Sequence, residues 1–333
     1  MKGYMFYMDS KMTVKATVKA AFDNGIIIPA FNIPYLPMLK PVTQAIVGEN
    51  SIAMVQVARL EWEKFEAKSP EAVAEEYFRY CKGGYTMLHL DHVPVIDEDD
   101  IRVDYLPILE RAIKIGYQSI MVDGSRLPLD ENIAVTKAAA MLAHASGIAL
   151  EAELGAVMGH ERGGISRSYD EIFEGKIGFT IPEEAARFVA GIGCDWLSVA
   201  AGSVHGAIAE NLRKQKKPEA RLDIEHIKAL RKAAGIPLVL HGGSGIRQEY
   251  ILEAIKAGVA KINVGTEIRQ PYEQAMEERG DTSYSQSVVY ERTCRTHMQR
   301  QAHRTYRTHK ACRSRRDVWH GEYRQGISRA TFL

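Results

Sequence analysis

Eight short runs rich in aliphatic and β-branched residues recur along the first 280 residues, and longer helix-like segments separate them. Strands and helices in strict alternation indicate a parallel sheet covered by helices. Eight such units are typical of the (β/α)8 barrel. The runs cover residues 26–33, 51–58, 85–93, 117–125, 148–157, 194–203, 236–243 and 260–267.

Start signals for helices lie between the runs, at residues 69–71, 180–184 and 223–225, where a polar cap precedes Pro or acidic residues. A doubly wound open sheet would show a similar alternation. Its Gly-x-Gly-x-x-Gly motif does not follow the first run, where residues 28–32 read Ile-Pro-Ala-Phe-Asn. We therefore predict an α/β protein with a single (β/α)8 TIM-barrel domain over residues 1–293.

Seven of the eight runs end on a residue that can bind a metal or transfer a proton, and the exception is Ala58. The active site of such a barrel is built where the strands end, so these side chains are expected to meet. Each alone has an ordinary alternative, such as a turn former, a cap or a structural His–Asp pair. The set comprises Asn32, Asp91 with His92, Asp123, Glu153, His205, His241 and Asn263.

Three of these strand-end residues are histidines, namely His92, His205 and His241. Three imidazoles give a divalent ion, with zinc the best match, three ligands and leave one position open, as in catalytic sites. Such a site polarises a carbonyl and stabilises an enediolate beside it. Asp91 stands next to His92, where it can exchange a proton with a substrate hydroxyl. Glu153 is a candidate fourth or alternate ligand.

Glycine-bearing loops follow the last two runs, at residues 241–247 and 263–267. Small residues there expose backbone N–H groups at the start of a helix, and this is the usual phosphate site of the fold. A metal and a phosphate site on one face imply a phosphorylated carbonyl substrate. A third connection, residues 155–178, is long and rich in Gly and charge, which is typical of a functional lid. Glu161 lies in this connection and is a candidate catalytic residue. An ordinary solvent-exposed loop glutamate would show the same sequence pattern.

Five motifs in this order resemble those of the class II, metal-dependent ketose-bisphosphate aldolases, which include the fructose- and tagatose-bisphosphate aldolases. The motifs are residues 88–92 (Leu-His-Leu-Asp-His), 151–155 (Glu-Ala-Glu-Leu-Gly), 204–206 (Val-His-Gly), 240–245 (Leu-His-Gly-Gly-Ser-Gly) and 261–264 (Lys-Ile-Asn-Val). The resemblance extends from about residue 20 to about residue 293. It implies reversible cleavage of a ketose 1,6-bisphosphate to dihydroxyacetone phosphate and an aldehyde, glyceraldehyde 3-phosphate.

The resemblance also implies roles for individual residues. Zinc would be bound by His92, His205 and His241, with Glu153 as a further carboxylate of the metal site. Asp91 would protonate the aldehyde-derived oxygen, and Glu161 would shuttle the proton at the dihydroxyacetone phosphate carbon. The phosphate would be held by Gly206, Gly242, Gly243, Ser244, Asn263, Val264, Gly265 and Thr266.

Other implications of the resemblance are a homodimer or homotetramer and a second divalent or a monovalent cation, on which the sequence is silent. Where many fructose-bisphosphate members have Ser, this chain has Ala58, so the choice among fructose, tagatose and other ketoses stays open. Two alternatives also stay open. One is a Schiff-base aldolase, for which Lys261 is the nearest amine; the other is a barrel without catalysis that serves as a binding protein.

The formal net charge of +1 gives no indication of a polyanionic partner. Residues 281–333, however, hold 11 Lys and Arg against 4 Asp and Glu. We interpret residues 294–333 as a divergent basic tail, because they lack the apolar stripe of a packed helix and the aromatic pattern of a nucleic-acid-binding arm. Four cysteines without a C-x-x-C spacing favour a reducing, cytoplasmic setting. The sequence shows no signal peptide and no run of ~18 apolar residues, so we predict neither export nor a membrane partner.

Overall fold

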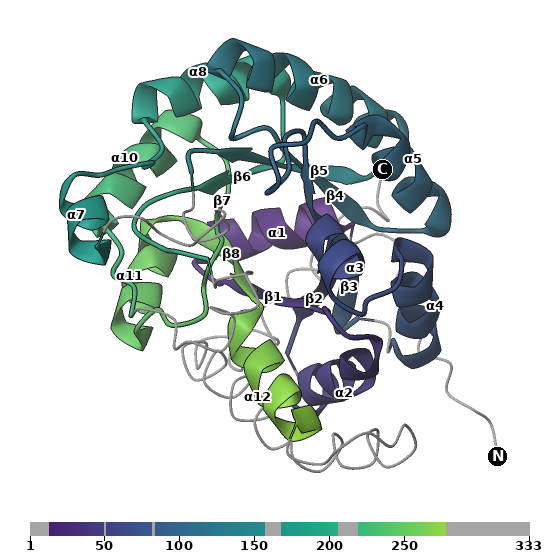
Figure 1. Ribbon diagram of the computed structural model, residues 1–333. Helices are drawn as coiled ribbons and strands as arrows, with labels where there is room; N and C mark the ends of the chain where they lie inside the picture. The colour runs from purple at the N-terminus through teal and green to yellow at the C-terminus, as the bar shows by residue number, and fades with distance from the viewer. Residues whose placement is uncertain (1–12, 50, 82–83, 157–167, 206–218, 278–333) are drawn as a thin grey trace, which may run out of the picture.

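Eight parallel strands close into a barrel in the order β1 to β8, with β8 pairing to β1 (Figure 1). The computed structural model describes residues 13–49, 51–81, 84–156, 168–205 and 219–277. Each expected run overlaps one strand, so the predicted (β/α)8 barrel is confirmed. The strands are β1 (Ile28–Asn32), β2 (Ala53–Ala58), β3 (Thr86–Pro94), β4 (Ser119–Asp123), β5 (Ala149–Leu154), β6 (Trp196–Val199), β7 (Leu238–Leu240) and β8 (Val259–Val264).

Helices surround the barrel, and two of the three expected start signals work as side-chain caps, whereas α8 begins after Ile181 without one. The Ser69 hydroxyl accepts a hydrogen bond from the Ala72 N–H, and the Asp223 carboxylate accepts one from the His226 N–H. The helices are α1 (Val14–Asp23), η1 (Leu36–Met38), α2 (Leu39–Gly48), α3 (Arg59–Lys64), α4 (Pro70–Tyr80), α5 (Tyr105–Ile115), α6 (Leu129–Ala145), α7 (Tyr169–Glu174), α8 (Pro182–Ile192), α10 (Ile224–Ala234), α11 (Gln248–Ala257) and α12 (Thr266–Glu277).

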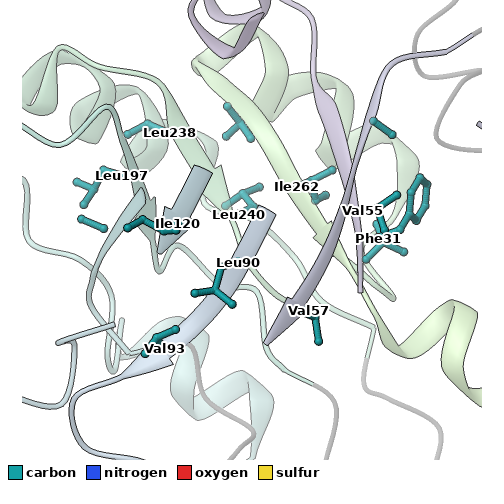
Figure 2. Close-up of a cluster of buried hydrophobic side chains, with 14 of the residues drawn as sticks. Phe31, Val55, Val57, Leu90, Val93, Ile120, Leu197, Leu238, Leu240 and Ile262 are labelled. Atoms are coloured by element: carbon teal, nitrogen blue, oxygen red, sulfur yellow. The ribbon is translucent and has the colours of Figure 1, made fainter. Parts of the chain in front are cut away.

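The largest hydrophobic core lies between the strands and the surrounding helices. Aliphatic side chains of neighbouring strands, such as Val55, Leu90, Ile120 and Leu240, are buried in it (Figure 2). Burial of each such side chain contributes about 1.5–3 kcal/mol. This layer fixes the strands, and with them the positions of the residues at the strand ends.

Helix α1 closes the amino-terminal end of the barrel. Its residues Val14, Val18 and Ala21 pack in a second apolar cluster with side chains from the beginnings of the strands, including Met87 and Trp196. The amino end is therefore filled with apolar side chains. The polar chemistry is left to the middle and the carboxyl end.

The middle of the barrel differs from the expectation of nearly continuously apolar strands. Gln56, His89, Glu151 and Lys261 lie on β2, β3, β5 and β8 and are all fully buried. Polar side chains at such depth are stable only when they are hydrogen-bonded or paired. They form the layer beneath the strand-end residues.

The interpretation of residues 294–333 as a separate tail concerns a part of the chain outside the described residues, as does the boundary at residue 293. Among the helices that the structure describes, none is both long and apolar enough to cross a membrane.

Candidate active site

His92 reaches the barrel mouth through an irregularity in β3. The pairing of β3 with β4 shifts register between Leu90 and Val93, and His92 has a φ of 24°. A positive φ is costly for a residue with a side chain and recurs at functional sites. The irregularity re-aims the His92 imidazole, as bulges near active sites commonly do.

The three predicted histidine ligands meet at the carboxyl end of the barrel. The donor atoms of His92, His205 and His241 all lie within 4.8 Å of one another. His92 Nε2 and His241 Nδ1 are 2.5 Å apart, and the ring centroids of His92 and His205 are 5.3 Å apart. Ring nitrogens that converge in this way are suited to sharing one cation.

Carboxylates hold the outward-facing nitrogens of two of these rings. Asp123 Oδ2 lies 3.3 Å from His92 Nδ1, and Glu151 Oε1 lies 2.8 Å from His241 Nε2. A carboxylate on the far nitrogen of a metal-binding His fixes the tautomer and the ring orientation. His92 is thereby set to offer Nε2 and His241 to offer Nδ1.

Glu153 lies against the same cluster. Its Oε2 atom is 3.3 Å from His241 Nδ1 and 3.7 Å from His92 Nδ1. This oxygen is buried and has no hydrogen-bond partner within the described part of the chain. An orphaned buried carboxylate oxygen next to converging imidazoles is an arrangement that a divalent cation would satisfy. The residues present thus fit the predicted metal.

The electrostatics of the cluster also favour a cation. Burial opposes the charged form of His92, but Glu153, Asp91 and Asp123 outweigh it and raise the pKa of His92 to about 10. Burial and the neighbouring Asp123 hold the pKa of Glu153 well above its ordinary value. Several carboxylates this close together favour a bound positive charge. A divalent ion supplies that charge as well as protons do.

Asp91 is held between two carboxamides. Asn32 Nδ2 donates to Asp91 Oδ2 and Asn263 Nδ2 donates to Asp91 Oδ1, each at 2.9 Å. Burial disfavours the charged carboxylate, yet the neighbouring imidazoles of His92 and His241 outweigh it and lower the pKa of Asp91. Asp91 therefore rests as a carboxylate of fixed orientation, ready to accept a proton.

The two predicted phosphate loops are adjacent. The Gly243 N–H donates to the Asn263 carbonyl at 3.0 Å, and the Ser244 hydroxyl accepts from the Glu267 N–H at 3.2 Å. Gly265 and Thr266 stand at the beginning of α12. The beginning of a helix offers N–H groups to an anion. Val264 is the last residue of β8 and leads into Gly265. Of the remaining predicted residues, Glu161 and Gly206 lie outside the described residues.

Sequence reasoning missed three buried residues that support the site, namely Gln56, Glu151 and Lys261 as a partner of Glu151. A period-two signal was present, because side chains two apart on a strand share a face. Glu151 stands two residues before Glu153, and Lys261 stands two residues before Asn263. Glu151 and Lys261 each lie one step deeper in the barrel than a recognised residue, whereas Gln56 lies two residues before Ala58, the one strand end without such chemistry.

A parallel barrel with imidazoles and a buried carboxylate converging at its carboxyl end is the arrangement of a metal-dependent barrel enzyme. The family model of class II fructose-bisphosphate aldolases matches residues 12–314. The fructose-bisphosphate aldolase of Streptococcus pyogenes serotype M1 is 32% identical over 268 residues, covering 78% of this chain and 80% of the relative. The Geobacillus stearothermophilus enzyme of the same name is 34% identical over 259 residues, covering 72% and 84%.

Solved structures give the same result. The YdjI aldolase from Escherichia coli K12 matches with a TM-score of 0.67 and 28% identity, over 89% of this chain and 96% of that chain. A fructose-bisphosphate aldolase from Campylobacter jejuni, at 20% identity and a TM-score of 0.65, shares the fold. This chain belongs to the class II fructose-bisphosphate aldolase family. It is therefore an aldolase, a carbon–carbon lyase, and the expected resemblance is confirmed.

Proposed function

We propose that this aldolase is zinc-dependent and reversibly cleaves a ketose 1,6-bisphosphate of the fructose or tagatose type. The products are dihydroxyacetone phosphate and glyceraldehyde 3-phosphate. The observation that carries the proposal is that His241 Nδ1 lies 2.5 Å from His92 Nε2 and 3.3 Å from the orphaned Glu153 oxygen. The names of the bacterial relatives support the substrate class.

His92, His205 and His241 would hold the ion, and Glu153 would complete or exchange with this set. When bound, zinc supplies an electrophile that polarises the substrate carbonyl and stabilises negative charge next to it. Asp123 and Glu151 keep the His92 and His241 rings turned toward the shared point. His92 also groups with Asp123 and Glu153 as candidate donors, but two of these residues already serve the first ion.

Asp91 exchanges a proton with the substrate hydroxyl whose oxygen becomes the aldehyde. Two carboxamide donors fix the orientation of its carboxylate and the neighbouring imidazoles lower its pKa, so it accepts the hydroxyl proton as the carbon–carbon bond breaks. In the direction of synthesis the same group returns that proton to the aldehyde-derived oxygen. Glu161 is assigned the other proton transfer, at the dihydroxyacetone phosphate carbon.

The phosphate of dihydroxyacetone phosphate is assigned to the loops after β6, β7 and β8. Asn263, Val264, Gly265 and Thr266 lead into the beginning of α12, which favours an anion through the helix dipole, while the Glu267 N–H already donates to the Ser244 hydroxyl. Gly243 and Ser244 contact this segment, Gly242 lies against Val204, and Gly206 would complete the group. The Gly243 N–H is already engaged by the Asn263 carbonyl, so Gly243 contributes by holding the two loops together.

We further propose a homodimer or homotetramer in the cytoplasm, with residues 1–293 as one domain and residues 294–333 as an appended tail.

The Schiff-base alternative needs a free amine as its nucleophile. The nearest candidate, Lys261, is fully buried and paired with Glu151 at 2.9 Å. A protonated amine in an ion pair is not a nucleophile.

Removal of the metal tests the proposal. Dialysis against a chelator should abolish cleavage of fructose 1,6-bisphosphate, and added Zn²⁺ should restore it, because no side chain replaces the electrophile. Tagatose 1,6-bisphosphate, measured in parallel, decides the substrate. Cleavage that survives chelation, or a covalent adduct trapped by borohydride and substrate, would refute zinc dependence.

A further inference from the structure

Lys261 is a fully buried cation in the middle of the barrel, below the metal-binding side chains. Its Nζ atom lies 2.9 Å from Glu151 Oε2 and donates to Asn263 Oδ1 at 2.7 Å. A buried ammonium group is tolerated only when it is paired and hydrogen-bonded. Lys261 therefore has two firm partners, and each of them leads to a different part of the active site.

The first partner leads to the proton-transfer group. An ammonium group only donates, so the Asn263 oxygen must face Lys261 and the Asn263 amide nitrogen must face away from it. That nitrogen donates to Asp91 Oδ1 at 2.9 Å. Lys261 thus determines which way the Asn263 carboxamide is turned. A flipped amide would present its oxygen to the Asp91 carboxylate and repel it.

The second partner leads to the metal ligands. Glu151 Oε1 lies 2.8 Å from His241 Nε2, while Glu151 Oε2 accepts from the Trp196 indole at 2.6 Å. With Lys261 on the same oxygen, the carboxylate is fixed on both sides. His241 is then held with Nδ1 toward His92 Nε2.

We propose that Lys261 is a positioning residue that holds the metal ligand His241 and the proton-transfer carboxylate Asp91 in register. It acts through Glu151 on the first and through Asn263 on the second. The inference rests on the proposed function, since it uses the roles given there to His241 and Asp91. The simpler alternative is that Lys261 only neutralises the buried charge of Glu151.

Variants at both ends of the ion pair separate these alternatives. E151Q removes the charge that needs neutralising, and E151Q/K261M then removes the ammonium without leaving a buried charge behind. K256M is the matched control, because Lys256 is an exposed lysine whose one ion-pair partner within the described residues is Glu253 on its own helix. Zn²⁺ affinity is measured by competition with a chromophoric chelator. Cleavage and proton exchange of dihydroxyacetone phosphate with solvent are measured at saturating Zn²⁺.

E151Q should bind Zn²⁺ roughly 10- to 100-fold more weakly and should recover cleavage at saturating Zn²⁺, as expected when the carboxylate behind a ligand is lost. E151Q/K261M should show the same affinity, but its cleavage should stay about 10²-fold lower, since Asp91 is no longer oriented. Its proton exchange should stay within about threefold of E151Q, because that step is assigned to another residue. K256M should match the unmodified protein in all three assays.

Cleavage by E151Q/K261M at the rate of E151Q would overturn the proposal and leave Lys261 as a neutralising group. If E151Q/K261M does not fold, E151Q/K261Q takes its place, because a glutamine still donates to Asn263. That variant should cleave within about tenfold of E151Q, and a loss of about 10²-fold or more would overturn the orienting role. The affinity measurements require no turnover. If the unmodified enzyme proves independent of metal, the proposed function is refuted. The effect of Glu151 on Zn²⁺ binding through His241 can still be measured in that case.

Discussion

Gly242 follows the metal-binding candidate His241 and has a φ of 65°, a conformation that L-residues seldom adopt. A Cβ atom added there would lie 2.2 Å from the Val204 carbonyl oxygen and 2.7 Å from its carbon. Val204 directly precedes His205. The substitution Gly242→Ala therefore wedges apart the two loops that carry two of the three candidate ligands.

The size of the effect follows from this contact. Real Cβ atoms essentially never approach closer than 3.0 Å, so one loop must move by roughly 0.8 Å. A displacement of that order at a catalytic site costs about 10²-fold in rate. The left-handed backbone adds about 1–2 kcal/mol of strain to the folded state. We expect Gly242→Ala to lower both Zn²⁺ affinity and cleavage by about 10²-fold.

Gly235→Ala is the matched control. Gly235 has nearly the same φ, 67°, but nothing lies within 4 Å of its added Cβ. Both variants should lose similar stability in thermal unfolding from backbone strain, and only Gly242→Ala should lose Zn²⁺ affinity in a chelator competition assay. Equal Zn²⁺ affinity of the two variants would refute the argument that this contact sets the spacing of His205 and His241.

Three further predictions concern other parts of the chain. Asp91→Ala should stop cleavage while proton exchange on dihydroxyacetone phosphate continues, whereas Glu161→Ala should lose both by about 10²- to 10⁴-fold; identical behaviour of the two variants would contradict the assigned roles. Deletion of residues 294–333 should leave Zn²⁺ binding and proton exchange intact, and loss of either would make the tail part of the working enzyme. Burial raises the pKa of Glu61 to about 8, so its protonated form stabilises the fold fully below about pH 4.5 and this contribution disappears as the pH rises through 8. Glu61→Gln should therefore flatten the fall of the unfolding free energy between pH 5 and pH 8 by a few kcal/mol, and parallel denaturation profiles of the two proteins would exclude this role.

The barrel could be predicted from the sequence because its signals are local. Helix α4 begins at Pro70 and α8 begins at Pro182. A Pro is common at the first position of a helix, so both starts could be predicted. The strand ends were found by the same kind of rule, since a polar residue after an apolar run is visible without knowing its neighbours. Asn32 and Asn263 were recognised in this way.

The supporting layer could not be predicted, because its contacts cross the barrel. Lys261 on β8 pairs with Glu151 on β5, which is not a neighbouring strand. Period-two spacing indicates which side chains of one strand share a face. It does not indicate which residue of a distant strand each of them contacts. The charged residues 59–64 are another case, because their structure depends on a buried contact. It forms the short helix α3, and the buried Glu61 accepts a hydrogen bond from the Ala58 N–H.

The Trp196 indole has an optical consequence. Its N–H bonds to Glu151, whose other oxygen holds His241, so this fluorophore lies two hydrogen bonds from the metal-binding cluster. A charge placed on the His241 ring changes the electric field along that path, and indole emission responds to such fields. Trp196 is almost completely buried, which protects it from soluble quenchers. The chain has three tryptophans, so in a W62F/W319F background the emission of Trp196 should report occupancy of the candidate metal site during a Zn²⁺ titration.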